Sequence, residues 1–274
     1  MQRPYLDPAL PVLWRTPDHV QVGLDPRHAY AFAAAPADTP ALLRLLTGTN
    51  TWEALRHQVR TRRSEATLRR LVDLLDGVGM LQDGAPADRW QPAWVEVVGD
   101  GATARVTTEV LRTAGVGRVH RRDTPAVPGP DLVVVTADRG RRMGLSEQLM
   151  AAGSPHLWCH LRDGRAVVGP LVRPGRTSCL RCQDLHRTDN DPAWPRLALA
   201  WEEQPATPSA AAATVAGMLS ARQALTWLHG APCATLDGTL EEQPDGSIAR
   251  EHWAPHPGCG CTWPDGAPSD QDAV

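Results

Sequence analysis

The sequence contains no lysine, because all 28 basic residues of this 274-residue chain are arginine. Lysine is the side chain that can act as an ammonium point charge or lose its proton when buried, so its absence excludes every mechanism that needs an ammonium side chain. The chain also lacks an apolar run of the roughly 20 residues that a membrane-spanning helix requires. Nothing near the N-terminus has the pattern of a secretory signal peptide. We therefore expect a soluble, cytoplasmic protein.

An excess of positive charge is also missing. The formal net charge is −3 and the isoelectric point is near 6.4. Nucleic acids and anionic membranes attract proteins through basic patches, so we expect neither as a partner. With 42% hydrophobic residues, the chain has enough apolar side chains for the cores of two modest domains.

Four of the six cysteines form two close pairs, Cys179 with Cys182 and Cys259 with Cys261. A disulfide inside so short a loop would be strained. Zinc, in contrast, binds four thiolates tetrahedrally and takes one short pair from each of two distant turns. The spacing therefore predicts a Zn²⁺ site with four sulfur ligands. Such a site is structural, because its filled coordination shell leaves no position for water or substrate.

The loops around both pairs support a metal site. Pro174–Gly175 precedes the first pair and His256–Gly258 leads into the second, and such Gly/Pro segments form tight turns. His186 and His256 are substitute ligands. Free buried thiols, or a disulfide joining the two pairs, are the alternatives. The two remaining cysteines stand alone in apolar surroundings and are expected in the core: Cys159 and Cys233.

The first 84 residues predict a small α+β module. Short extended runs at 12–14, 20–24 and 29–32 are separated by turn residues, which indicates a three-stranded meander. A strand at 78–81 is expected to return after the helices. This return strand would complete the module.

Three helices are predicted between the meander and the return strand. Thr39 followed by proline is expected to cap the first helix, which stops at Gly48. Asn50, with Glu53 three residues later, resembles a capping box for the second. Ser64 is expected to cap the third, which Gly77 ends.

This order of three strands, three helices and a final strand resembles the winged-helix RiPP recognition element, a PqqD-like module that binds the leader of a ribosomally made peptide. The resemblance implies that the leader adds as a strand beside residues 29–32 and packs on the helix at 65–75, an edge-strand augmentation. The alternative is that these side chains only form the core of the module. The residues that the resemblance implies for peptide binding are Ala29, Tyr30, Ala31, Phe32, Leu68, Leu71, Val72 and Leu75.

Residues 85–90 are predicted as a linker, and the pattern changes after them. A buried strand at 94–98 runs into a glycine-containing turn, a helix at 105–114 and another strand. This βαβ order predicts a Rossmann-like α/β domain, with the glycine turn where a phosphate would meet a helix N-terminus. The apolar run 131–136 is expected to be the next parallel strand.

The remainder of this second domain extends to residue 261. Strands are predicted at 155–159 and 166–171, and Ser209 is expected to cap a long helix that ends at Gly230. A hairpin formed by 235–242 and 247–253 would deliver the second cysteine pair. The polar tail 262–274 is expected to be disordered.

The sequence from the glycine turn to the second cysteine pair resembles the ThiF/E1-like fold. More narrowly, the segments 169–182, 184–187 and 255–261 resemble the E1-like partner protein of azole-forming, YcaO-associated peptide cyclodehydratases. The resemblance covers nearly the whole chain. A recognition element fused to an E1-like domain is the arrangement that it implies.

The ATP site that the resemblance implies is degenerate. Its remnants are Gly99, Gly101, Asp123 and Asp138. The connection after Asp123 is rich in proline and has no Asn or Arg, and no lysine is present to neutralise a triphosphate. Nucleotidyl transfer depends on concentrated positive charge, so we do not expect ATP as a cofactor and assign no catalytic residue. Compensation could come only from nearby arginines: Arg139, Arg141 and Arg142.

The favoured hypothesis is a non-catalytic E1-like protein. It would bind the leader of a precursor peptide and present the peptide to a YcaO-type cyclodehydratase acting in trans. The first alternative is an active adenylyltransferase of ThiF type that acts on a carboxylate or peptide C-terminus. The second is a zinc-stabilised scaffold outside peptide modification. The resemblance also implies a homodimer.

Overall fold

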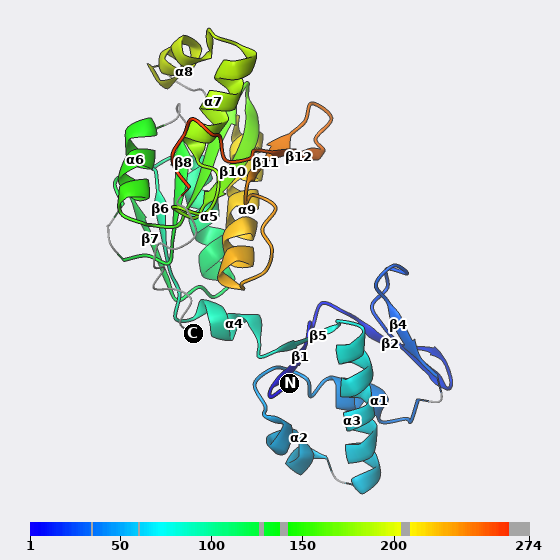
Figure 1. Ribbon diagram of the computed structural model, residues 1–274. Coiled ribbons are helices and arrows are strands. Elements are labelled where there is room, and N and C mark those ends of the chain that lie inside the picture. Colours follow the sequence, from blue (N-terminus) through cyan, green and yellow to red (C-terminus); the bar gives the residue numbers. More distant parts are fainter. Residues whose placement is uncertain (34, 60, 126–128, 138–141, 204–208, 263–274) are drawn as a thin grey trace. The chain divides into compact units, whose positions relative to one another are not determined.

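The computed structural model describes residues 1–33, 35–59, 61–125, 129–137, 142–203 and 209–262. Its chain divides into two compact units, Met1–Asp88 and Arg89–Val274, which are considered separately below (Figure 1). Within the described ranges, no helix is long and apolar enough to cross a membrane. The expected disordered tail lies outside the described residues, apart from Thr262.

Unit 1 contains two small antiparallel sheets. Strands β2 (Val12–Thr16), β3 (His19–Val22) and β4 (Tyr30–Phe32) pair in that order, which confirms the predicted meander. The return strand is β5 (Leu81–Asp83), later than expected, and it pairs with β1 (Pro4–Leu6). The sequence pattern did not predict β1, because a run of three residues is too short to show alternation.

The three predicted helices are present. They are α1 (Thr39–Leu43), α2 (Trp52–Gln58) and α3 (Arg62–Gly77). The predicted cap at Thr39 is wrong, because Thr39 is already helical and Asp38 occupies the cap position. Helix α1 also ends well before Gly48, since the chain must turn there to bring Thr47 beside β1.

The caps of α2 and α3 also differ from the prediction. Thr51, rather than Asn50, caps α2, and its side chain accepts from the amide of Ala54. Thr61, rather than Ser64, caps α3 and accepts from the Ser64 amide. The Ser64 hydroxyl instead donates to Asp38 (2.7 Å), so it ties α3 to the start of α1.

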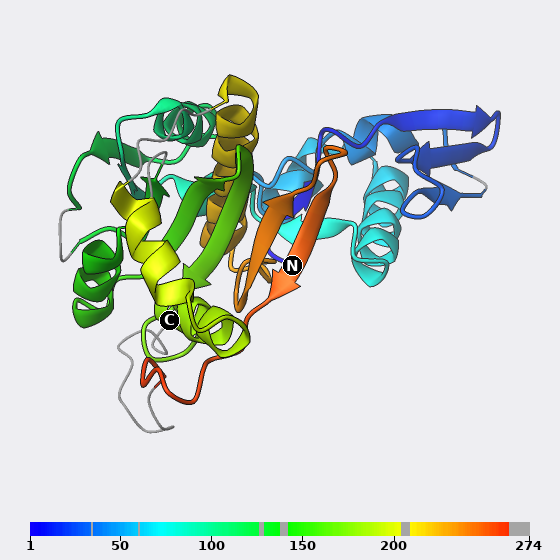
Figure 2. The same cartoon turned by 90° about the horizontal axis from the view of Figure 1, so that it is seen from above.

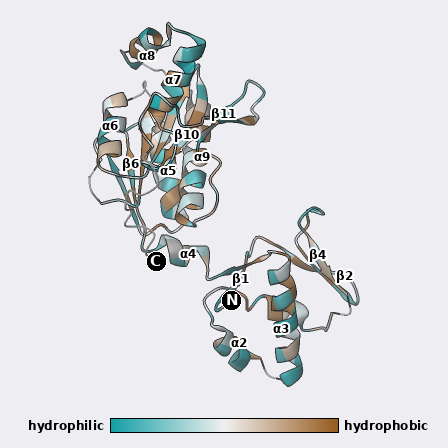
Figure 3. Cartoon of the chain, in the orientation of Figure 1, coloured by the Kyte–Doolittle hydropathy of each residue, from teal (hydrophilic) through white to brown (hydrophobic). Residues whose placement is uncertain are grey.

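One hydrophobic core joins the strands and helices of unit 1. The apolar side of α3 faces this core and its polar side faces solvent (Figure 3). Val20 and Val22 of β3 and Phe32 of β4 complete it from the meander. The core is therefore formed by one face of the meander, and the other face remains open.

Unit 2 is built on a mixed sheet in the order β12-β11-β10-β9-β8-β6-β7, which confirms the predicted α/β class. Four neighbouring strands are parallel: β6 (Trp94–Val98), β7 (Arg118–Arg122), β8 (Leu132–Ala137) and β9 (His156–Arg162). Three further strands are antiparallel: β10 (Arg165–Val172), β11 (Gly238–Glu242) and β12 (Ile248–His252). The predicted hairpin is thus β11–β12.

Helices cover both faces of this sheet (Figure 2). Helices α5 (Ala102–Thr113) and α9 (Ala210–Leu228) pack on one face, with Ser209 capping α9 as predicted. Helices α6 (Met143–Ala151) and α7 (Leu180–Asn190) contribute to the core on the other face. Helix α8 (Trp194–Glu203) follows α7, and the sequence patterns predicted none of α6, α7 and α8. Helix α4 (Pro86–Trp90) occupies most of the segment predicted as a linker.

Close packing of α5 against α9 fixes one face of the sheet. A Cβ atom at Gly217 of α9 would lie 2.6 Å from the Cβ of Val106, so only glycine allows this approach. The hydroxyl of Thr107 also donates to the carbonyl of Gly217 (3.3 Å). The cysteine-bearing loops gather on the opposite face of the sheet.

Candidate metal centre and binding surfaces

The first cysteine pair lies at the start of α7. Cys179 is the cap residue and Cys182 is in the first turn, so the helix sets the spacing of the two thiols. The preceding loop turns at Gly175, whose φ of 79° suits glycine. The backbone amide of Ser178 donates to Asp237 (2.7 Å), which fixes this loop beside the start of β11.

The second cysteine pair follows β12. The amide of Cys259 donates to the carbonyl of His256 (2.9 Å), and Gly260 turns the chain with a φ of 71°. Thr262 then forms an isolated parallel bridge with Gly175 of the first loop. Pairing of the two loops therefore brings the distant cysteine pairs together.

All four sulfurs of Cys179, Cys182, Cys259 and Cys261 lie within 4.8 Å of one another. The shorter distances between Sγ atoms are 4.0 Å for Cys179 to Cys182, 3.6 Å for Cys179 to Cys259 and 3.2 Å for Cys182 to Cys261. A tetrahedral zinc site with Zn–S bonds of about 2.3 Å requires sulfur separations of roughly 3.8 Å. The cluster has the chemistry and approximate dimensions of a four-sulfur metal site, and all four cysteines are free thiols.

The thiols of the cluster are close enough to shift one another's pKa values in opposite directions. Hydrogen bonds from Cys179 and Cys261, and one from the His256 amide (3.3 Å), lower the pKa of Cys182. Hydrogen bonding with Cys182 raises the pKa of Cys179 to about 12, and hydrogen bonds with Cys179 and Cys182 raise the pKa of Cys261. One thiolate is therefore favoured in the absence of a cation. A bound divalent metal would offset the mutual repulsion and allow all four sulfurs to ionise.

His256 and His186 lie beside the sulfur cluster rather than in it. The amide of Gly258 donates to Nδ1 of His256 (3.0 Å), which leaves Nε2 to donate to Asp189 of α7 (2.9 Å). His186 uses Nε2 with the carbonyl of Ala254 (2.9 Å). These bonds position the second cysteine turn on α7. Both ring nitrogens of His256 take part in these hydrogen bonds, and its ligand atom lies within 4.8 Å of those of His186 and Asp189. The four sulfurs, three of them in buried residues, are the better ligand set. Sequence reasoning missed Asp189, which no local motif distinguishes.

The glycine turn after β6 has a packing role. Gly99 has a φ of 135°, and a Cβ atom there would lie 2.3 Å from the hydroxyl of Thr136 in β8. Its amide donates to the carbonyl of Arg122 (2.9 Å), so this amide is not available to a phosphate. Gly101 is the cap residue of α5. The presence of glycine at 99 is therefore explained without a nucleotide.

Other residues predicted near the nucleotide remnant are only partly described. Asp123 is exposed directly after β7, and Arg142 donates to its backbone carbonyl (3.1 Å). Arg142 thus lies at the carboxyl end of the parallel strands. Asp138, Arg139 and Arg141 are outside the described residues.

The residues predicted for peptide binding fall into two groups. Leu68, Leu71, Val72 and Leu75 of α3 are all at most 8% exposed and belong to the core of unit 1, as does Phe32. A peptide cannot reach these side chains unless α3 moves. The other three are accessible in part: Ala29 and Tyr30 are half-buried and Ala31 is exposed.

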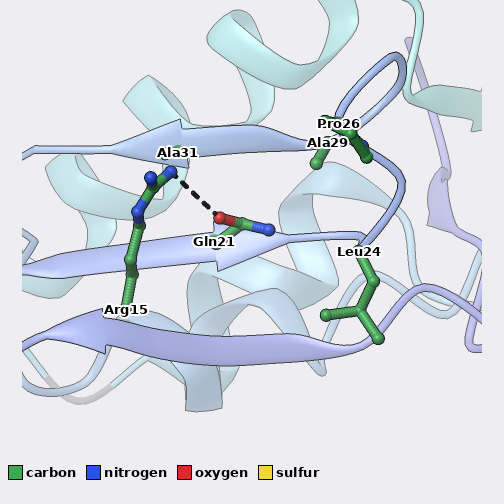
Figure 4. A pocket seen from close by; sticks show the side chains of 6 residues that line it. All are labelled: Arg15, Gln21, Leu24, Pro26, Ala29 and Ala31. Carbon is green, nitrogen blue, oxygen red and sulfur yellow. Dashed lines mark hydrogen bonds between the residues drawn. The ribbon is translucent and has the colours of Figure 1, made fainter.

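Strand β4 is at one edge of the meander. An edge strand offers main-chain groups to a further strand. The open face of the meander also carries a hollow of about 330 Å³ (Figure 4). Sequence reasoning missed this hollow, because only the register of the strands places its residues together: Arg15, Gln21, Leu24, Pro26, Ala29 and Ala31.

No protein-family model and no curated protein sequence matches the chain. Solved structures do match it. A heterocyclase in complex with substrate and cofactor superposes with a TM-score of 0.67 at 16% identity, covering 96% of this chain and 40% of the heterocyclase. The heterocyclase TruD gives a TM-score of 0.64 at 18% identity, covering 96% of this chain and 43% of TruD.

A further match is Escherichia coli MccB with succinimide, with a TM-score of 0.60 at 16% identity. That match covers 96% of this chain and 100% of MccB. MccB has also been solved with ATP and with MccA. The chain therefore has the fold that MccB and part of these heterocyclases share, although it spans less than half of either heterocyclase.

Proposed function

We propose that this protein binds a ribosomal precursor peptide through unit 1 and presents it to a separate azole-forming enzyme of the YcaO type. The observation that carries the proposal is the shared fold with two heterocyclases over 96% of the chain. In each heterocyclase the shared part is less than half of the protein. The proposal assigns the cyclisation chemistry to a partner in trans.

The leader peptide is proposed to pair with β4 as an additional strand. The support is the edge position of β4 and the partial exposure of Ala29 to Ala31. Main-chain hydrogen bonds would supply affinity, as in other edge-strand complexes. Side chains of α3 would contribute through its exposed face or after a small displacement, because its apolar side chains are buried.

The four-sulfur cluster is proposed to bind structural Zn²⁺. Four soft ligands in a nearly buried cluster favour zinc, and His256 fixes the turn around them. The metal would tie the loop before α7 to the loop after β12. This role supplies folding energy rather than catalysis.

Adenylation is the second candidate function. MccB, which matches over its full length, has been solved with ATP, and Arg142 offers one cation at the end of the parallel strands. Against this candidate stand the absence of lysine and the use of the Gly99 amide within the sheet. ATP–pyrophosphate exchange separates the two: we expect no exchange above a protein-free blank, and exchange that depends on the protein would replace the presenter role with adenylation.

Peptide binding is tested with the full chain and a displayed library of random peptides. We expect enriched peptides that protect the backbone amides of β4, but not those of β2, from hydrogen exchange. Recovery of no binding peptide would contradict the presenter role and leave the scaffold alternative.

The transfer of the peptide to a partner enzyme is tested separately. Addition of a YcaO-type enzyme and ATP should remove water from Cys, Ser or Thr of a substrate fused to a selected peptide, and mass spectrometry detects this loss. Size-exclusion chromatography with light scattering tests the proposed homodimer.

A further inference from the structure

The open face of the meander in unit 1 differs in character from its core-facing side. Strand register places Leu13 of β2 opposite Gln21 of β3, and Gln21 opposite Ala31 of β4. Because side chains alternate along a strand, these residues share the face opposite Val20 and Val22, which are fully buried. Alanines on the β4 side leave space above the sheet.

Arg15 lies at one end of the hollow on this face (Figure 4). Its Nη1 donates to Oε1 of Gln21 (3.3 Å), and Nε2 of Gln21 donates to the carbonyl of Gly23 (2.8 Å). Gln21 is thereby oriented and holds the guanidinium in place. A guanidinium has five N–H donors, and within the described part of the chain no carboxylate pairs with Arg15.

The other end of the hollow is apolar. Pro26 lies there beside Ala29, away from the Arg15 and Ala31 end, and the Leu24 side chain extends from the end of β3 toward β2 (Figure 4). Leu24 is 67% exposed, which leaves a large apolar side chain in water. The hollow thus combines a held cation and an apolar contact about two residues apart along β4.

We propose that this hollow selects peptides that carry an Asp or Glu two residues from an apolar side chain. This inference rests on the proposed function, in which the peptide pairs with β4. A strand added there would lie about 4.8 Å from β4, with alternate side chains on the same face as Ala31. A carboxylate reaching back over Ala31 meets Arg15, and a guanidinium binds a carboxylate through two parallel hydrogen bonds. The next side chain on that face lies over Ala29 and meets Pro26.

The test uses the full chain and the displayed library of random peptides, selected in parallel on the natural protein and on Arg15→Glu. We expect the natural protein to enrich an acidic residue two positions from an apolar one. Arg15→Glu should enrich Lys or Arg at the acidic position, because the charge in the hollow is reversed. Identical selected peptides for both proteins would overturn the inference while leaving the proposed function intact. Failure to enrich any peptide on either protein would overturn both.

Affinity measurements on one selected peptide sharpen the result. Arg15→Gln should weaken binding about fivefold at low salt, as expected for one partly exposed ion pair, and less at high salt. Replacing the peptide acid by its amide should cost the same factor and add nothing in combination with Arg15→Gln. Ala31→Leu fills the hollow from an exposed position and should weaken binding at least as much. The control Arg222→Gln removes an exposed arginine of α9 and should change nothing. Additive losses would contradict a direct contact.

Discussion

Removal of the metal should destabilise unit 2 alone. The perturbation is a chelator added to the full protein, or the substitution Cys182→Ala. Cys182 is fully buried, its sulfur is the hydrogen-bond acceptor at the centre of the cluster, and it packs in the same core as Val98 and Leu180. Unit 1 contributes no residue to the cluster. The unfolding transitions of unit 1 and unit 2 are therefore expected to respond differently to loss of the metal.

The magnitude follows from binding linkage. A zinc concentration 1,000 times the dissociation constant stabilises the folded state by about 4 kcal/mol. For a unit of the size of Arg89–Val274, each kcal/mol corresponds to about 2–4 °C in the melting temperature. Chelation should consequently lower the melting temperature of unit 2 by roughly 8–16 °C and leave that of unit 1 unchanged.

Differential scanning calorimetry with and without chelator measures this shift, and elemental analysis counts the bound zinc. We expect one zinc per chain in the natural protein and none in Cys182→Ala. The matched control is Cys233→Ala, which also deletes a buried thiol but lies outside the cluster. It should lose some packing energy and keep its zinc. The reasoning would be refuted if the purified protein contained no metal and its melting temperature did not change on addition of the chelator.

Three further predictions concern single side chains. His156 is buried, and desolvation lowers its pKa to about 4 from 6.5. As the pH falls, the unfolded state therefore binds a proton on this histidine before the folded state does. The free energy of unfolding should decrease between pH 7 and pH 4, with about 2 kcal/mol lost at pH 5. Denaturant titrations should show this loss in the natural protein and not in His156→Asn, and parallel pH profiles would contradict the assignment. Thr61→Ala removes the cap of α3 and should cost unit 1 about 1 kcal/mol in chemical unfolding; an unchanged free energy of unfolding in Thr61→Ala would contradict this cap. His256→Ala should weaken zinc binding about 10-fold to 100-fold in competition with a metal indicator, and unchanged affinity would show that His256 does not position the cysteine turn.

Local patterns determined much of the architecture. The run Leu132–Ala137, in which Thr136 is the single polar residue, indicated a strand covered on both faces, and the short extended runs of β2 to β4 indicated a three-stranded meander. The pattern at 209–230 defined α9 with its cap. Helices α6 and α7 escaped prediction because their periodicity is weak. In α7, for example, only Leu180, Cys182 and Gln183 are buried, so most of the helix carries no apolar stripe.

The sequence by itself determined which residues could ligate a metal, because thiol chemistry and the short spacing of each cysteine pair are local properties. Only the tertiary structure decided that the pairs meet, through the bridge between Gly175 and Thr262 and the bond from Ser178 to Asp237. It also buried the α3 side chains expected to contact a peptide and assembled the Arg15 hollow from three strands. The physical reason is range: propensity and periodicity act over a few residues, whereas burial and contact depend on segments that are distant in the chain.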